Sequence, residues 1–258
     1  MTETVLHGGD LNVVVRVGET VRRPLGPWSP AVHALLRHFE AVGFDGAPRF
    51  LGVDDEGREM LSYIGGEAAV APVPGGAEVP FTIGSLLRGA HDAQASFVRP
   101  IGATWQSMIG GAKGGEVVCH NDLFWPNVIF RAGSPVALID WDLAAPAPRV
   151  HDVASAARFW APLRPDEQAE ARGLPTERRR ERLLALCDGY ELSHRRRAAM
   201  LEGGYELGRK WIETYRSWGR DRRFPGWSGM WDRDGDRYLL ATQRWLVGHR
   251  AEISSWLR

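Results

Sequence analysis

The chain has 258 residues, of which 44% are hydrophobic and 25% are charged, and its 32 basic residues balance its 32 acidic residues. This length and composition are typical of a globular protein with one large domain or two lobes. The balanced charge argues against a nucleic-acid partner. No apolar run is long enough to span a membrane, the first residues do not resemble a signal peptide, and two cysteines favour a reducing compartment. We therefore expect a cytoplasmic protein with no membrane contact, and we infer no obligate protein partner.

The basic residues are almost all arginines. Lys113 and Lys210 are the only lysines in the chain. A function that needs a lysine side chain upstream of Lys113 is therefore excluded.

The first part of the chain is predicted to form strands around one helix. Short β-branched and apolar runs bounded by turn residues indicate strands at 11–17, 20–23, 50–53 and 59–64. Ser29 and Pro30 suit the N-cap and the first position of a helix over about residues 30–42.

The stretch 65–80 is rich in glycine and proline and predicts a hinge between two lobes. A helix is expected at 81–95, short strands at 119–139, and mainly helices from 153 to the end. The expected fold class is α+β, with a small β-rich lobe at 1–64 and a larger, mainly helical lobe at 65–258.

Polar side chains gather around a predicted hairpin in the second lobe. Short apolar strands at 128–130 and 136–139 are joined by a turn, and a hairpin brings the outer ends of its strands together. The side chains expected at that end are Asp122, Asn127, Asp140 and Asp142. Oxygen ligands without a His/Cys set favour a hard cation such as Mg²⁺, and a remaining carboxylate can act as a base. For each residue alone a role as a turn former is the favoured interpretation, but the whole set at this spacing favours a site.

This region resembles the aminoglycoside phosphotransferase family, which has a protein-kinase-like fold. The resemblance rests on the pattern His-x-Asp-x-x-x-x-Asn at 120–127 and on Ile-Asp-Trp-Asp at 139–142. The family implies a phosphotransferase that moves the γ-phosphoryl group of ATP or GTP to a hydroxyl of an aminoglycoside or another hydroxylated small molecule. The resemblance implies that Asp122 is the base, that Asn127 and Asp140 hold Mg²⁺, and that His120 and Asp152 are structural. Asp142 is a weaker metal candidate or a turn residue.

The resemblance also implies nucleotide contacts in the first lobe. Gly8 and Gly9 stand where the family has a loop over the phosphates, although an ordinary turn explains two glycines almost as well. Tyr63 and Ile64 would form the hinge whose backbone binds the base of the nucleotide.

The sequence departs from the kinase pattern at the lysine that meets the phosphates. The strand at 20–23 offers Arg22 and Arg23 instead, and alternation along a strand sends only one of them into the cleft. Arg22 is favoured by the family pattern, and Arg23 is the alternative.

A second departure is the missing acid early in the helix. Residues 31–35 contain no glutamate, and Glu40 stands too close to the helix end. His33 could face the cleft, but a surface histidine is favoured. These departures leave a second hypothesis open, which is a catalytically degenerate protein that binds a nucleotide or another ligand. The sequence does not identify the acceptor, because the motifs locate only the phosphate chemistry.

Overall fold

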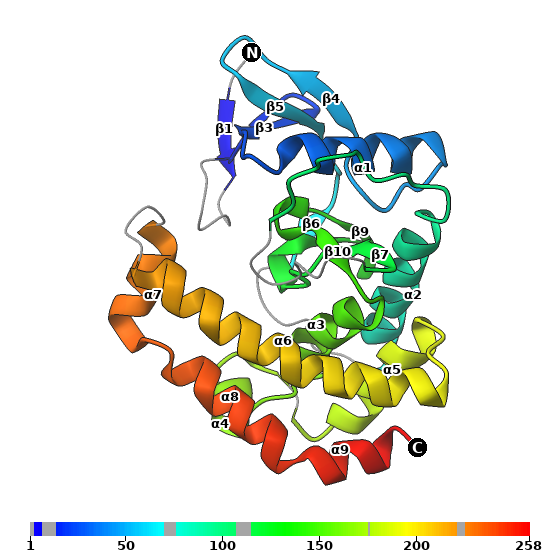
Figure 1. Cartoon of the computed structure of the whole chain (residues 1–258), viewed down its shortest axis with the longest axis vertical. Helices are drawn as coiled ribbons and strands as arrows, with labels where there is room; N and C mark the ends of the chain where they lie inside the picture. The colour runs from blue at the N-terminus through cyan, green and yellow to red at the C-terminus, as the bar shows by residue number, and fades with distance from the viewer. Residues whose placement is uncertain (1–2, 7–13, 70–75, 107–114, 175, 221–224) are drawn as a thin grey trace.

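The computed structural model describes residues 3–6, 14–69, 76–106, 115–174, 176–220 and 225–258 (Figure 1). The N-terminal part is an antiparallel sheet with the strand order β1-β2-β3-β5-β4. Its strands are β1 (Glu3–Leu6), β2 (Val14–Val17), β3 (Thr20–Pro24), β4 (Phe50–Val53) and β5 (Arg58–Ser62). The predicted phosphate-loop residues Gly8 and Gly9 lie outside the described residues.

One helix, α1 (Ser29–Ala41), packs beside this sheet (Figure 1). Proline in its first turn has the backbone angle that a helix start needs. The N-cap is Trp28, one residue before the predicted one, and the Ser29 hydroxyl accepts a hydrogen bond from the Gly26 amide at 2.9 Å. The buried face of α1 recurs at helical spacing and comprises Val32, Leu35, Leu36 and Phe39.

The next strands form two smaller antiparallel sheets. One has the order β6-β8-β9 and consists of β6 (Glu67–Ala68), β8 (Val128–Arg131) and β9 (Ser134–Leu138). The other pairs β7 (Val117–Cys119) with β10 (Ala145–Ala147). Single 3-10 turns at Trp125–Asn127 and Trp141–Leu143 flank the β8–β9 hairpin.

The rest of the chain is helical. The helices are α2 (Glu78–Asp92), α3 (Val150–Trp160), α4 (Asp166–Glu170), α5 (Arg179–Gly189), α6 (His194–Arg220), α7 (Pro225–Asp234), α8 (Arg237–Gly248) and α9 (Arg250–Trp256). Helices α2 and α5 approach so closely that a Cβ on Gly84 would lie 2.3 Å from the Leu186 carbonyl oxygen. Among the described residues, no helix is both long and apolar enough to cross a membrane.

One hydrophobic core joins the N-terminal helix to the later elements. Phe39 of α1 packs edge-on against Trp141, with ring centroids 5.2 Å apart, and both side chains are almost fully buried. The α+β fold class is confirmed, with an antiparallel sheet followed by a mainly helical region. The lobe boundary near Gly65 stays a prediction.

Candidate active site

The β8–β9 hairpin brings its polar ends together, as the sequence predicted. Val128 pairs with Leu138, and the Ile139 amide donates a hydrogen bond to the Asn127 carbonyl oxygen at 2.9 Å. Asn127 directly precedes β8, and Asp140 follows β9 two residues after its end. Residues on either side of the hairpin therefore meet at one point, although they are separated along the chain.

Asp122 lies against the Asn127 side chain. The Asn127 amide nitrogen donates to a carboxylate oxygen of Asp122 at 2.9 Å and to its carbonyl oxygen at 3.0 Å. Burial raises the pKa of Asp122 to about 7, and the negative charge of Asp140 adds to this rise, whereas Asn127 and Arg158 oppose it. A carboxylate with this pKa exchanges its proton near neutral pH.

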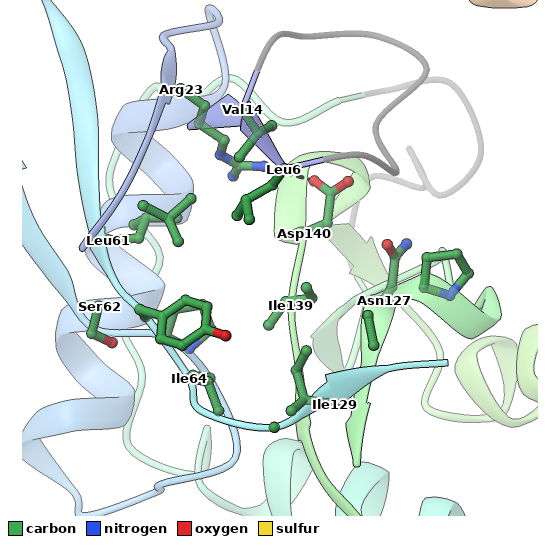
Figure 2. Close-up of a pocket in the computed structure, with 16 residues that line it drawn as sticks. Leu6, Val14, Arg23, Leu61, Ser62, Ile64, Asn127, Ile129, Ile139 and Asp140 are labelled. Carbon is green, nitrogen blue, oxygen red and sulfur yellow. Dashed lines mark hydrogen bonds and ion pairs between the residues drawn. The ribbon is translucent and has the colours of Figure 1, made fainter. Parts of the chain in front are cut away.

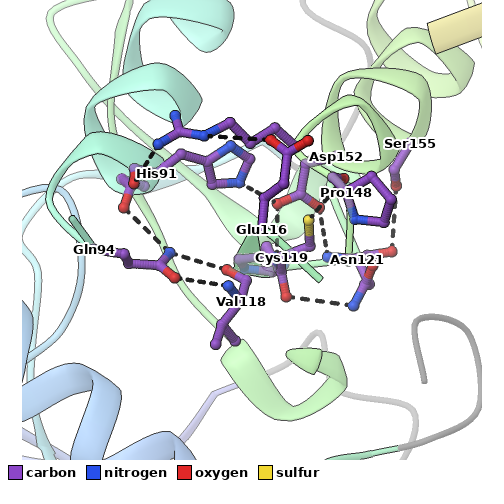
Figure 3. A network of polar contacts seen from close by, with 12 residues as sticks. His91, Gln94, Glu116, Val118, Cys119, Asn121, Pro148, Asp152 and Ser155 are labelled. Atoms are coloured by element: carbon purple, nitrogen blue, oxygen red, sulfur yellow. Dashed lines mark hydrogen bonds and ion pairs between the residues drawn. The ribbon is translucent and has the colours of Figure 1, made fainter. Parts of the chain in front are cut away.

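The loop that carries Asp122 is held in place by Asp152 (Figure 3). The buried Asp152 carboxylate accepts hydrogen bonds from the backbone amides of His120 and Asn121, both at 2.7 Å, and from His91 Nε2 at 3.0 Å. Burial alone would raise the pKa of Asp152, but these donors bring it below its usual value. Asn121 has a positive φ of 66°, a backbone conformation that this network supports.

His120 is fully buried, as expected for a structural residue. Its Nε2 atom lies 2.8 Å from the Ile139 carbonyl oxygen, and its ring packs on Trp141 with centroids 4.6 Å apart. Both contacts tie the loop before β8 to the segment after β9. The two cysteines are buried and carry no disulfide, and burial raises the pKa of the Cys119 thiol.

Arg23 of β3 is the arginine that enters the site. Its Nη1 atom lies 2.7 Å from an Asp140 oxygen, its Nη2 atom lies 2.7 Å from an Asp142 oxygen, and its Nε atom donates to Glu59. Burial would lower the pKa of Arg23, but the carboxylates of Asp142, Asp140 and Glu59 raise it well above its usual value. Arg23 therefore stays charged.

Arg22 is on the opposite face of the same strand, and the expectation that it faces the cleft is wrong. Its Nη1 atom lies 3.0 Å from an Asp54 carboxylate oxygen, and its Nε atom donates to the Thr20 hydroxyl at 3.3 Å. The sequence offered two adjacent arginines, and the pleat of β3 sends one to each side. The family pattern favoured Arg22, whereas the structure places Arg23 at the cavity.

Glu59 and His33 are two site residues that the motifs did not identify. Glu59 of β5 is only 1% exposed, and its two carboxylate oxygens contact Arg23 Nε and His33 Nε2. His33 is 6% exposed, so its interpretation as a surface histidine is wrong. The β3–β5 register, which the structure supplies, identifies Glu59, because Arg23 lies directly opposite Glu59 in that pair. Glu40 is not part of this group, and one of its carboxylate oxygens lies 3.8 Å from Arg49 Nε.

A cavity of about 310 Å³ lies between the N-terminal sheet and the β8–β9 hairpin (Figure 2). Arg23, Asn127 and Asp140 line its polar part, and Figure 2 places Ile64 and Ile129 at the opposite end. The remaining lining residues are mostly apolar and include Val14, Val21, Leu61, Tyr63 and Ile139. Such a cavity suits a flat, largely apolar group with a charged tail.

The polar end of the cavity fits a hard divalent cation. The Asn127 amide nitrogen is turned to Asp122, which leaves its oxygen available on the cavity side. The Asp140 side chain is 43% exposed and also lines the cavity. One amide and one carboxylate oxygen, with space for water and phosphate, are the ligands that Mg²⁺ accepts. Asp142 is bound to Arg23 and does not line the cavity, which favours its interpretation as a turn residue.

The family to which the chain belongs follows from comparisons with known proteins. The model of the phosphotransferase enzyme family matches residues 101–186, which include the loop and the hairpin of the site. A curated relative, the trifolitoxin immunity protein of Rhizobium leguminosarum bv. trifolii, is 40% identical over 205 residues, which are 78% of this chain and 78% of the relative. The chain belongs to the phosphotransferase enzyme family.

Solved structures of aminoglycoside phosphotransferases and of a choline/ethanolamine kinase family protein share the fold. A choline/ethanolamine kinase family protein from Mesorhizobium loti is 17% identical, with a TM-score of 0.57 over 95% of this chain and 93% of that one. An ADP-bound aminoglycoside phosphotransferase is 12% identical, with a TM-score of 0.57 over 98% and 94% of the two chains. A gentamicin complex of another such enzyme is 13% identical, with a TM-score of 0.54 over 98% and 93%. At these identities the likeness establishes a shared fold.

Proposed function

We propose that this phosphotransferase-family protein transfers the γ-phosphoryl group of ATP or GTP to a hydroxyl of a small molecule. The proposal rests chiefly on one arrangement: Arg23, Asn127 and Asp140 line the polar end of an otherwise apolar cavity, and Asp122 is hydrogen-bonded to the Asn127 side chain. The apolar part of the cavity suits the base and the sugar, and its polar part suits the phosphates and their metal. The backbone at Tyr63 and Ile64 would bind the edge of the base.

Two residues would hold Mg²⁺, namely Asn127 through its amide oxygen and Asp140 through its carboxylate. Bound Mg²⁺ would neutralise charge on the phosphate oxygens. Arg23 would direct its terminal nitrogens at the phosphates, and a guanidinium suits this role because it stays charged and can donate two parallel hydrogen bonds. This assignment replaces Arg22.

Asp122 would orient the acceptor hydroxyl and accept its proton. The hydroxyl oxygen forms a bond to the γ-phosphorus while the bond from that phosphorus to the β–γ bridging oxygen breaks, and the nucleoside diphosphate leaves. With a pKa of about 7, Asp122 is ionised in a substantial fraction of molecules at neutral pH and is still basic enough to take a proton. The rest of the catalysis is positioning and charge neutralisation.

The names of related proteins suggest the class of acceptor. The relative that is 40% identical is named for immunity to a toxin, and two of the similar structures are aminoglycoside phosphotransferases. We infer that the acceptor is a hydroxylated antibiotic, toxin or related metabolite. Phosphorylation would add negative charge to the acceptor and so change what it can bind.

The test is an acceptor screen with a matched pair of variants. The protein is incubated with Mg-ATP or Mg-GTP and a panel of aminoglycosides and other hydroxylated compounds, and phosphorylated products are measured by mass spectrometry. We expect Asp122→Asn to lower transfer about 1,000-fold while nucleotide binding persists, because removal of a general base costs on this order. The control is Asp55→Asn, which changes an exposed carboxylate in the β4–β5 turn.

Two outcomes would count against the proposal. Equal transfer by Asp122→Asn and the wild type would remove Asp122 from the reaction. Nucleotide binding without transfer to any compound would favour the alternative, a degenerate protein that binds a nucleotide. The presence of Arg23 and Glu59 in the site weakens the argument for that alternative, because the departures that motivated it are compensated.

A further inference from the structure

We propose that Glu59 is the positioning residue for Arg23 and that His33 holds Glu59 in place. Together they would replace the missing helix glutamate. This inference rests on the proposed function, because it concerns the arginine that would bind the nucleotide phosphates. In this arrangement strand β5 supplies the acid, and helix α1 contributes a histidine in place of a glutamate.

The three side chains form a continuous chain of contacts from the helix to the cleft. Arg23 and Glu59 are direct partners in the β3–β5 register, so both side chains leave the sheet on the same face. One Glu59 oxygen contacts Arg23 Nε, and the other lies 2.5 Å from His33 Nε2. His33 is stacked on Phe50 of β4, with centroids 3.7 Å apart. Each member is therefore held on at least two sides.

The position of Glu59 determines which atoms of Arg23 reach the site. A guanidinium has a rigid planar set of donors, so an anion bound at Nε fixes the direction of the two terminal nitrogens. In the structure one of these nitrogens points to Asp140, which lines the polar part of the cavity, and the other points to Asp142, which lies outside the lining. A phosphate that displaces the Asp140 contact would meet donors that are already oriented.

Stability alone is a weak explanation of this arrangement. A buried ion pair gains little over apolar side chains of similar volume, because removing both charges from water is costly. Glu59 and Arg23 are both among the buried residues, and Arg23 also faces two further carboxylates. A role in orienting Arg23 accounts both for the buried acid and for its second bond to His33.

The same two strands provide a matched control on their other face. Arg22 and Asp54 form an ion pair of the same chemistry at 3.0 Å, and neither residue lines the cavity. Asp54 also accepts hydrogen bonds from the backbone amides of Glu56 and Arg58. Asparagine can accept those turn bonds as well, so Asp54→Asn keeps the turn and removes the ion pairs of Asp54 with Arg22 and Arg58.

The experiment measures the affinity of the full-length protein for Mg-ATP and Mg-GTP by isothermal titration calorimetry. We expect Glu59→Gln to weaken binding about tenfold or more, because it removes one charge-assisted hydrogen bond that orients Arg23. Asp54→Asn should leave the affinity within about twofold of the wild type. Simple electrostatics predicts the opposite sign for Glu59→Gln, since loss of a nearby anion should favour a polyanionic nucleotide. Binding by Glu59→Gln that equals or exceeds that of the wild type would therefore overturn the proposal.

A second pair of variants tests the same role without changing the buried acid. Glutamine at position 33 can still donate to Glu59, and leucine cannot, so His33→Gln should bind nucleotide nearly as well as the wild type and His33→Leu should bind several-fold more weakly. If Glu59→Gln fails to fold, equal binding by the two His33 variants overturns the positioning role. A wild-type protein that binds neither nucleotide would instead overturn the proposed function as well.

Discussion

The polar groups of the site come from two regions that are assembled differently. Between Asp122 and Asp142 they are supplied by one loop and one hairpin, so neighbours in space are also neighbours in sequence. In the N-terminal region Arg23, Glu59 and His33 come from two strands and a helix. The first region depends on local turns and the second on a strand register. A substitution in the first region should therefore act mainly by altering the conformation of the loop. A substitution in the second region should act mainly by altering the orientation of Arg23.

The largest effect is expected from Asp152, the buried acid that binds the backbone amides of the loop. Asp152→Ala leaves the amides of His120 and Asn121 and the His91 ring without their shared acceptor. Loss of one member of such a buried charged network costs about 3–5 kcal/mol of unfolding free energy. Urea denaturation followed by circular dichroism measures this change, and Asp45→Ala, at an 89% exposed side chain, is the control. An equal unfolding midpoint for Asp152→Ala and the control would show that the loop does not depend on this acid.

The next effect concerns the N-terminal region and its arginine. Arg23→Met should weaken Mg-ATP binding about 100-fold, because it removes the charged fork that would meet the phosphates. Arg23→Lys should lie between this variant and the wild type, since an ammonium keeps the charge but lacks the planar donors. Isothermal titration calorimetry on both variants measures their Mg-ATP affinities and so tests this order. If Arg23→Met binds as well as Arg23→Lys, the guanidinium is not part of the nucleotide site.

The difference between the regions also explains what the sequence could predict. Asp122, Asn127 and Asp140 were predicted to converge because a hairpin brings its own ends together, whatever the rest of the fold is. The choice between Arg22 and Arg23 required the phase of the pleat relative to the cavity, and a run of two arginines contains no such information. Glu59 required the register of two strands separated by a helix, and His33 could be assigned only after Glu59 was placed. Non-local partners of this kind follow from packing and not from a motif.

A smaller effect is expected from pH. The pH dependence of transfer reports on the ionisation of Asp122 and not on Arg23, which stays charged. The Asp122 pKa is raised to about 7, and the base must be ionised to accept a proton. The rate of transfer should therefore fall about tenfold per pH unit below pH 7 and level off above it. Arg158 opposes the rise in this pKa, so Arg158→Met should move the acidic limb to higher pH. Initial rates of phosphorylation between pH 5.5 and 9 measure both profiles. If the acidic limb of the profile stays at the same pH in Arg158→Met, Asp122 is not the group whose ionisation controls the rate.

The smallest effect is expected at Arg22, directly beside Arg23 in the sequence. Arg22→Met removes the ion pair with Asp54 on the far face of the sheet, where Asp54 keeps Arg58 as a second partner at 2.9 Å. Nucleotide affinity should stay within about twofold of the wild type, because partly exposed ion pairs contribute little and this one does not reach the cavity. The same calorimetric titration that ranks the Arg23 variants measures it. A loss at Arg22 comparable to that at Arg23 would mean that the phosphates are met from the other face of β3, and both the arginine assignment and the role of Glu59 would then be wrong.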